Sequence, residues 1–123
     1  MSKRKIKFRV WDVEAKRMIG AKQTPLAAAV WTQTEPDDFV LMQYTGLKDV
    51  AGKEIFEGDL ISHNQDAQRV DVYKIQWDEF EQFHARDVDP KRQQNVLEYW
   101  WLGKFWKQIC IVGNVHENPE LLK

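Results

Sequence analysis

Residues 46–62 read GLKDVAGKEIFEGDLIS, a stretch in which three glycines stand six residues apart between short apolar runs. Gly52 occupies a spot suited to a turn with positive φ, and Gly58 one where a bulge or sharp bend precedes the strand resuming at Leu60. The stretch opens no evident helix and lacks the Gly-Lys-Ser/Thr ending of a phosphate-binding loop. We therefore predict a structural corner, which bends a short strand around a small barrel, in preference to a ligand loop.

Strands are expected before this corner. In residues 5–12, KIKFRVWD, apolar and basic side chains alternate with a period of two, which predicts a strand with one core face and one wet face. The core set is Ile6, Phe8 and Val10, and the wet set is Lys5, Lys7 and Arg9. Asp12 then starts a hairpin turn to a return strand at Met18. Residues 37–47 are apolar on both alternating sets, as expected of a central strand covered on both faces.

More strands are expected after the corner. Residues 69–80 predict one strand, and residues 96–114 predict two more around Gly103. Between them, residues 79–94 turn polar around Pro90, which predicts an excursion over the surface.

Two short helical pieces complete the pattern. Thr24 and Pro25 fit the start of a short helix, and Asn118 and Pro119 fit the cap and first position of a final helical turn. Many short strands with brief helices predict a single domain, residues 1–123, of the mainly β class. We expect a small, partly closed pseudo-barrel with short helical caps.

The composition excludes several classes of protein. Eighteen basic residues against nineteen acidic ones give a formal net charge of −1, so no global cationic field attracts nucleic acid or an anionic membrane. No apolar run approaches the roughly 20 residues of a membrane helix, and no signal peptide is evident. Cys110, the single cysteine, lies in an apolar run, which predicts a buried thiol in a reducing compartment. We expect a cytoplasmic protein without a membrane partner.

Three segments resemble the YopX family of phage and prophage proteins. They are IKFRVWDVEAKRM at residues 6–18, LMQYTGLKDVAGKEIFEGDLI at residues 41–61 and CIVGNVHENPELL at residues 110–122. The resemblance implies a small β-rich pseudo-barrel with a helical cap, a viral or prophage setting, and the capacity to form oligomers. It brings no catalytic residues, and residues 64–108 depart most from the family pattern.

No constellation of residues points to catalysis, a metal or a cofactor. The histidines are widely spaced, and no Cys-x-x-Cys or His-x-x-x-His pattern is present. Cys110 sits where a thiolate is disfavoured. Glu57 and Asp59 come nearest to a catalytic pair because residues two apart on a strand share a face, but Gly58 between them indicates an open bend. We expect a protein that is not an enzyme and that uses no metal or cofactor.

The aromatic stretch EYWWLGKFW, residues 98–106, is the strongest candidate for a binding surface. Tyr99, Trp100, Trp101 and Trp106 belong to a cluster with more aromatic area than one small core readily hides. In a strand, Trp100 and Trp101 point to opposite sides, so one ring should face outward. We predict a surface here for self-association or for another protein; the alternative is a core sealed by the polar excursion before it.

The leading functional hypothesis is a non-enzymatic phage or prophage accessory protein in the cytoplasm of the bacterial host, acting through protein binding or self-association. The alternative is a local nucleic-acid-binding module, in which Lys5, Lys7 and Arg9 meet the aromatic stretch as stacking platforms. Against this alternative, the same three cations fit the wet face of an outer strand, where they discourage edge-to-edge pairing. A small enzyme is the third hypothesis, and it requires a pocket with strongly shifted pKa values.

Overall fold

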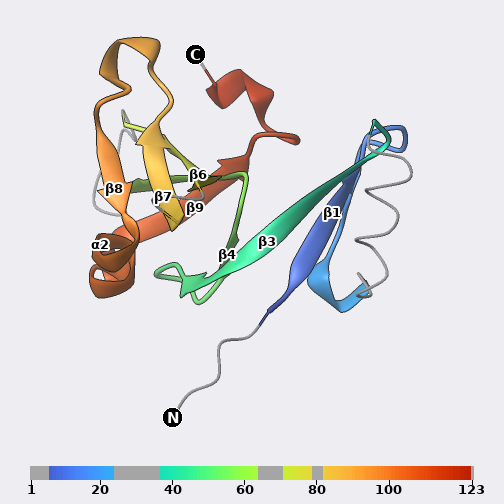
Figure 1. Cartoon of the computed structure of the whole chain (residues 1–123), viewed down its shortest axis with the longest axis horizontal. Coiled ribbons are helices and arrows are strands. Elements are labelled where there is room, and N and C mark those ends of the chain that lie inside the picture. The colour runs from blue at the N-terminus through green and yellow to red at the C-terminus, as the bar shows by residue number, and fades with distance from the viewer. Residues whose placement is uncertain (1–5, 24–36, 64–70, 79–81, 123) are drawn as a thin grey trace.

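Two antiparallel β-sheets make up most of the protein, in a computed structural model that describes residues 6–23, 37–63, 71–78 and 82–122. The first sheet contains β1 (Phe8–Asp12), β2 (Arg17–Ile19), β3 (Phe39–Lys48) and β4 (Glu54–Phe56), in the order β2-β1-β3-β4. The second contains β5 (Asp59–His63), β6 (Tyr73–Asp78), β7 (Gln82–Asp87), β8 (Val96–Glu98) and β9 (Ile109–Asn114), in the order β8-β7-β6-β5-β9. The sheets meet where the chain leaves β4 (Figure 1).

Short helical segments lie between and after the strands. The α-helix α2 (Tyr99–Lys104) follows β8 directly. The 3-10 helices are η1 (Ala21–Gln23), η2 (Pro90–Arg92), η3 (Trp106–Gln108) and η4 (Pro119–Leu121). The predicted class is confirmed: the fold is mainly β, a partly closed barrel with short helical caps. The helix predicted at Thr24 lies outside the described residues.

β1 and β3 form the long ribbon of the first sheet, seen in Figure 1. Val10 is fully buried and Met42 is 2% exposed, so both strands turn apolar side chains into the interior. Asp12 Oδ1 accepts a hydrogen bond from the Ala15 N–H at 3.0 Å, which confirms the predicted hairpin turn. Ile6, expected in the core, lies before β1 begins and is 64% exposed.

The predicted corner in residues 46–62 joins the two sheets, because β4 ends in the first and β5 begins in the second. Gly52 has a φ of +81° and Gly58 a φ of +89°. The Gly58 N–H donates to the Ile75 carbonyl, and the Gly58 carbonyl accepts the Val115 N–H, both at 2.9 Å. The bend is therefore tied to β6 and to the segment after β9, as a structural corner requires.

The main core lies between the second sheet, β4 and α2. Its buried side chains come from alternate positions of the strands, as period-two patterning demands, and from one position of the helix. They are Ile55, Ile61, Tyr73, Ile75, Ala85, Leu102 and Ile109. Burying an aliphatic side chain of this size stabilises a fold by about 1.5–3 kcal/mol, so Leu102 is a substantial anchor for the short helix that carries it.

β7 corrects the prediction of a surface excursion over residues 79–94. It is a six-residue strand that pairs with β6 on one side and β8 on the other. Phe83 and Ala85 are buried on one of its faces, and the polar His84 between them is only 2% exposed, so polar residues interpreted as a surface stretch lie within a covered strand. Among the described residues of that stretch, the excursion is the loop after β7, where Pro90 begins η2.

The segment after β9 docks against the first sheet. Pro119 begins η4 and Asn118 occupies the cap position, both as predicted, but the Asn118 side chain makes no capping hydrogen bond, because its Oδ1 accepts the Asn114 N–H at 3.1 Å. The Trp11 ring of β1 stacks on His116, with ring centroids 5.3 Å apart and planes 13° from parallel. This stack connects both ends of the described chain.

The first prediction concerns the acid sensitivity of this stack. Burial, reinforced by the Arg9 guanidinium, lowers the pKa of His116 from 6.5, and Glu117 partly opposes the shift. The neutral ring therefore contributes stability above pH 6.5 that is lost as the pH falls through the folded-state pKa. We expect acidification from about pH 7.5 to about pH 5 to lower the free energy of unfolding more in the wild type than in His116→Phe. Urea denaturation measures this, and equal losses would contradict it.

The second prediction tests the corner. A Cβ at Gly58 would lie 3.2 Å from Met42 Sδ and 3.6 Å from Val115 Cγ2, whereas a Cβ at Gly52 would meet nothing within 4 Å. Because both glycines have positive φ, Gly52→Val is the matched control for backbone strain, at about 1–2 kcal/mol. Gly58→Val adds crowding, and we expect a total loss of about 2–4 kcal/mol. Equal melting temperatures for the two variants would remove the packing argument.

Candidate functional site

Residues 96–114 contain the two predicted strands, β8 and β9, but the aromatic stretch between them forms a helix instead of extending either strand. α2 spans Tyr99–Lys104 and is closed by the Phe105 N–H, which donates to the Trp101 carbonyl. Leu102 is 1% exposed and belongs to the main core. The burial of this one side chain explains why a segment rich in strand-favouring aromatics is helical, since tertiary packing overrides local propensity.

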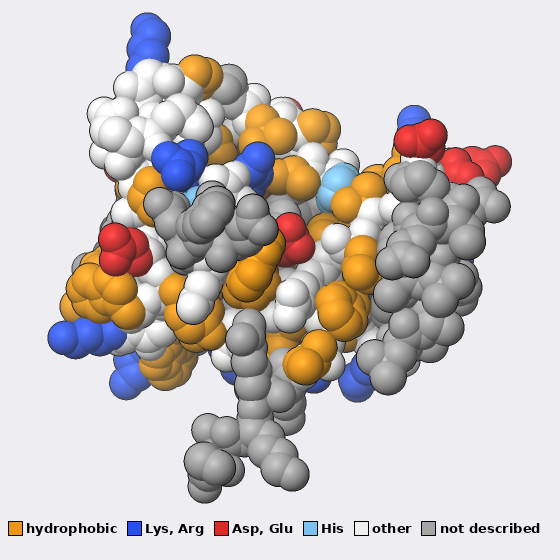
Figure 2. Space-filling model, in the orientation of Figure 1, with side chains coloured by type: hydrophobic (Ala, Val, Ile, Leu, Met, Phe, Trp, Pro, Cys, Tyr) orange, Lys and Arg blue, Asp and Glu red, His pale blue; other side chains and the backbone are white. Residues whose placement is uncertain are grey.

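The predicted partner-binding residues differ in exposure and in what they contact. The Tyr99 hydroxyl donates to the Thr45 carbonyl at 2.9 Å, and Trp101 is half-buried against the main core. Trp100 is 61% exposed and Trp106 is 39% exposed. One of the two adjacent indoles therefore faces outward, as predicted, and the two exposed rings belong to different hollows. Figure 2 shows apolar side chains next to Lys and Arg at the corner of the molecule where α2 lies.

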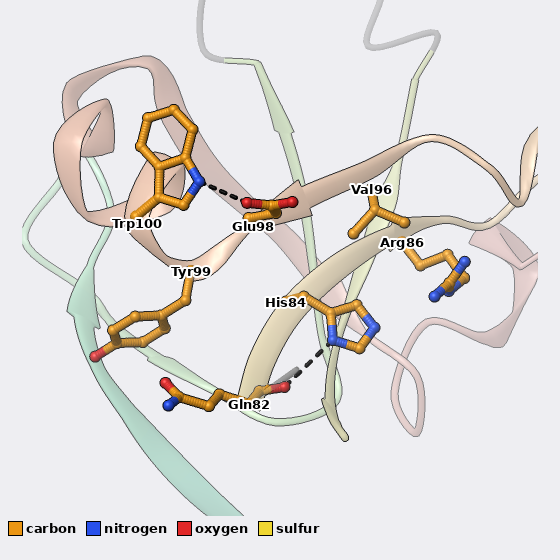
Figure 3. Close-up of a pocket in the computed structure, with 7 residues that line it drawn as sticks. All are labelled: Gln82, His84, Arg86, Val96, Glu98, Tyr99 and Trp100. Atoms are coloured by element: carbon orange, nitrogen blue, oxygen red, sulfur yellow. Dashed lines mark hydrogen bonds between the residues drawn. The ribbon is translucent and has the colours of Figure 1, made fainter. Parts of the chain in front are cut away.

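The first hollow, called here the Trp100 groove, has a volume of about 580 Å³. It lies over β7, β8 and the start of α2, and its lining comprises Trp100 with Gln82, His84, Arg86, Val96, Glu98 and Tyr99. Figure 3 shows His84 between Trp100 at one end and Arg86 at the other. Alternation along β7 and β8 explains the set, because Gln82, His84 and Arg86 share one face of the sheet with Val96 and Glu98.

Hydrogen bonds hold the polar side chains of the Trp100 groove in place. Trp100 Nε1 donates to Glu98 Oε2 at 2.6 Å. His84 Nδ1 lies 3.3 Å from the Gln82 carbonyl, and His84 Nε2 lies 3.0 Å from Gln76 Nε2. Both ring nitrogens of His84 therefore have hydrogen-bond partners within the sheet. Its ring is a fixed polar surface at the floor of the groove.

The second hollow, called here the Trp106 slot, has a volume of about 330 Å³. It lies between the turn that joins β3 to β4 and the end of α2, and Gly46, Leu47, Lys48, Gly52, Gly103 and Trp106 line it. A Cβ at Gly103 would sit 3.5 Å from Leu47 Cδ2, so the helix and β3 approach closely here. The slot is shallow, mostly apolar and of a size to accept a side chain of another protein.

The basic residues of the first strand do not form the wet face expected from the sequence. Arg9 Nη2 lies 2.7 Å from Asp59 Oδ1, and the two side chains are only 12% and 3% exposed. Lys7 Nζ lies 2.6 Å from Glu54 Oε2, at 34% and 29% exposure. Lys5 lies outside the described residues. Both described cations of the predicted nucleic-acid set are thus engaged in ion pairs that connect β1 to the corner.

The two carboxylates that came nearest to a catalytic pair are structural neighbours of the same corner. Burial raises the pKa of Glu57, which accepts a weak hydrogen bond from the Gln43 N–H. Burial also raises the pKa of Asp59, while the Arg9 guanidinium and the Phe56 N–H lower it. Each carboxylate has an intramolecular partner, and in the described part of the chain no group of His, Cys, Asp and Glu is placed to hold a metal ion. Cys110 is buried, as predicted.

Sequence analysis missed most of the Trp100 groove. Gln82, His84 and Arg86 fell within the stretch interpreted as a polar excursion, and Glu98 was noticed only as a flank of the aromatics. The signal that could have found them is QFHARD at residues 82–87, in which polar and apolar side chains alternate.

The comparison with protein families decides the relationship of this chain to others. Residues 22–123 match the model of the YopX protein family. The chain belongs to the YopX family. This YopX family chain is similar to protein EF1440 from Enterococcus faecalis, known from its crystal structure, at 28% identity. The two share a TM-score of 0.66 over 98% of this chain and 100% of that one.

A comparison with curated protein sequences finds no match for this YopX family chain. Of the helices that the structure describes, none is long and apolar enough to cross a membrane.

The third prediction compares the ion pair of Arg9 in β1 with that of Lys7, the residue before this strand. Removing one partner of a buried pair leaves an uncompensated charge, so Arg9→Met should lower the free energy of unfolding by about 3–5 kcal/mol. Lys7→Met is the matched control two residues earlier, just before β1, and its more exposed pair should contribute only about 0–1 kcal/mol. Chemical denaturation of both variants measures the difference. Losses of the same size would show that the Arg9–Asp59 pair has no special role.

Proposed function

We propose that this YopX family protein is a non-enzymatic phage or prophage accessory protein that acts by binding protein in the cytoplasm of the bacterial host. The partner that the surface favours is a second copy of the same chain. The observation that carries this proposal is the Trp106 slot, an apolar hollow with a partly exposed indole at its wall. The phage setting rests on the family to which the chain belongs.

The slot offers both a cavity and a projection to fill one. Val50 is 38% exposed and stands in the turn between two slot residues, Lys48 and Gly52. Its N–H donates to the Ile109 carbonyl at 2.9 Å, which fixes the turn against β9 next to the segment that carries Trp106. Two copies related by a twofold axis can each present Val50 to the slot of the other, the self-complementary arrangement of a symmetric dimer.

Electrostatics favour a second copy over a strongly charged partner. The net charge of −1 gives two copies little mutual repulsion. Exposed aromatic and aliphatic side chains beside a pocket are also the composition typical of the centre of protein interfaces, where tryptophan is enriched. Catalysis has weaker support, since the carboxylates with raised pKa lie at the corner and have partners within the chain.

The fourth prediction is the oligomeric state and its dependence on the slot. Size-exclusion chromatography with light scattering should give twice the chain mass at high protein concentration. Trp106→Ser and Val50→Asp should each raise the dimer dissociation constant about tenfold or more, as expected of central interface residues. Trp100→Ser is the matched control, because this indole lies outside the slot. A wild-type protein that stays monomeric at millimolar concentration, or an equal effect of Trp100→Ser, would overturn self-association at this surface.

A further inference from the structure

Two cations face each other on the outer surface of the second sheet. Lys74 of β6 and Arg86 of β7 are direct register partners, so their side chains leave the same face at neighbouring positions. Both are half-exposed, and neither has an ion pair with a carboxylate among the described residues. Like charges directly opposite on a sheet are destabilising. An anion bound between them would relieve this repulsion.

The cations adjoin the Trp100 groove. Arg86 lines that groove and also a smaller hollow of about 220 Å³, whose lining includes Lys74, Gln76 and Gln93 together with Asp87, a carboxylate that is 1% exposed and paired with Arg92. Arg86 Nη1 donates to the Gln93 carbonyl at 2.6 Å, which fixes the guanidinium and leaves its other N–H groups for a ligand. A continuous path therefore runs along β7, from the indole of Trp100 over His84 to Arg86 and Lys74.

The other end of the path offers an aromatic platform. Trp100 is 61% exposed, and its Nε1 donates to Glu98 Oε2, a bond that holds the ring by one edge. A planar ring presented in this way can stack on another planar ring. Glu98 disfavours a phosphate at this end, so an anionic ligand must place its charge toward Arg86 and its planar group toward Trp100. The His84 ring and the Gln76 and Gln82 amides lie between.

We propose that this path binds single-stranded nucleic acid, with a base stacked on Trp100 and the phosphates of the adjoining nucleotides at Arg86 and Lys74. A base in a duplex is already stacked, so an indole platform selects unpaired strands. Two phosphate contacts and one stacked base give weak binding that falls with salt. This site is distinct from Lys5, Lys7 and Arg9, and it does not depend on self-association at the Trp106 slot.

The fifth prediction is binding of a fluorescently labelled ten-nucleotide oligothymidine, followed by anisotropy across a salt series. With two phosphates neutralised, the logarithm of the binding constant should fall against the logarithm of salt concentration with a slope of about −1.4, or about −0.7 per contact. Lys74→Gln and Arg86→Gln should each remove about half of this slope. Trp100→Ala should weaken binding about tenfold, and Trp100→Phe, which keeps an aromatic ring, should largely restore it.

Matched controls separate this site from general effects. Trp106→Ala removes an exposed indole outside the path, and Lys91→Gln removes an exposed cation in the loop after β7; neither should change binding. Near-ultraviolet circular dichroism checks that each variant is folded. Arg86→Gln also breaks the Arg86–Gln93 hydrogen bond, whereas the Trp100 and Lys74 variants leave this bond in place and therefore test the site without it. The proposal is overturned if the oligothymidine does not bind at low salt, if a duplex binds as tightly, if a neutral oligosaccharide displaces it, or if Trp106→Ala weakens binding as much as Trp100→Ala.

Discussion

Asp59 holds the two sheets together at the point where the chain passes from one to the other. Asp59 Oδ1 accepts a hydrogen bond from Arg9 Nη2 of β1, and Asp59 Oδ2 accepts one from the Phe56 N–H across the bend, both at 2.7 Å. Burial raises the pKa of this carboxyl, and the Arg9 charge opposes the shift, so each group makes the burial of the other tolerable. The Arg9 guanidinium also lies 4.8 Å from the centre of the Phe56 ring. The angle between the sheets therefore depends on one buried ion pair.

A second buried carboxylate completes the barrel on the other side. Asp49 is 2% exposed, and its oxygens accept the N–H groups of Ala51, Lys53 and Ile111 at 2.9–3.0 Å. The first two bonds close the turn between β3 and β4, and the third satisfies the edge strand β9. An unpaired strand edge is prone to pair with other chains. Asp49 thus gives β9 a partner within the chain and fixes the turn that forms one wall of the Trp106 slot.

The fold was predictable wherever local chemistry and tertiary structure demand the same thing. Glycine at positive φ is required by the backbone alone, so the corner at Gly58 could be recognised without knowing what surrounds it. The position of β1 could likewise be predicted locally, because its apolar and polar side chains alternate along the strand. What alternation could not show is that Arg9 turns into a buried pair, because its partner Asp59 is distant in the chain. β7 was missed because His84 and Arg86 look solvent-exposed in sequence and become part of a covered sheet only when β6 and β8 pair beside them.

Helical geometry gives the aromatic stretch two separate surfaces, which sequence could predict only in part. The composition shows that residues 98–106 carry more aromatic area than one small core can bury, which predicts an outward-facing ring. Trp100, which is 61% exposed, is that ring. The division between groove and slot depends on Leu102, whose burial makes the segment helical. Successive residues of a helix point about 100° apart, so Tyr99 reaches back to β3, Trp100 faces the outer surface of β7 and β8, and Gly103 meets Leu47. The burial of Leu102 therefore positions the rings that α2 carries, and both hollows are built on packed, hydrogen-bonded supports.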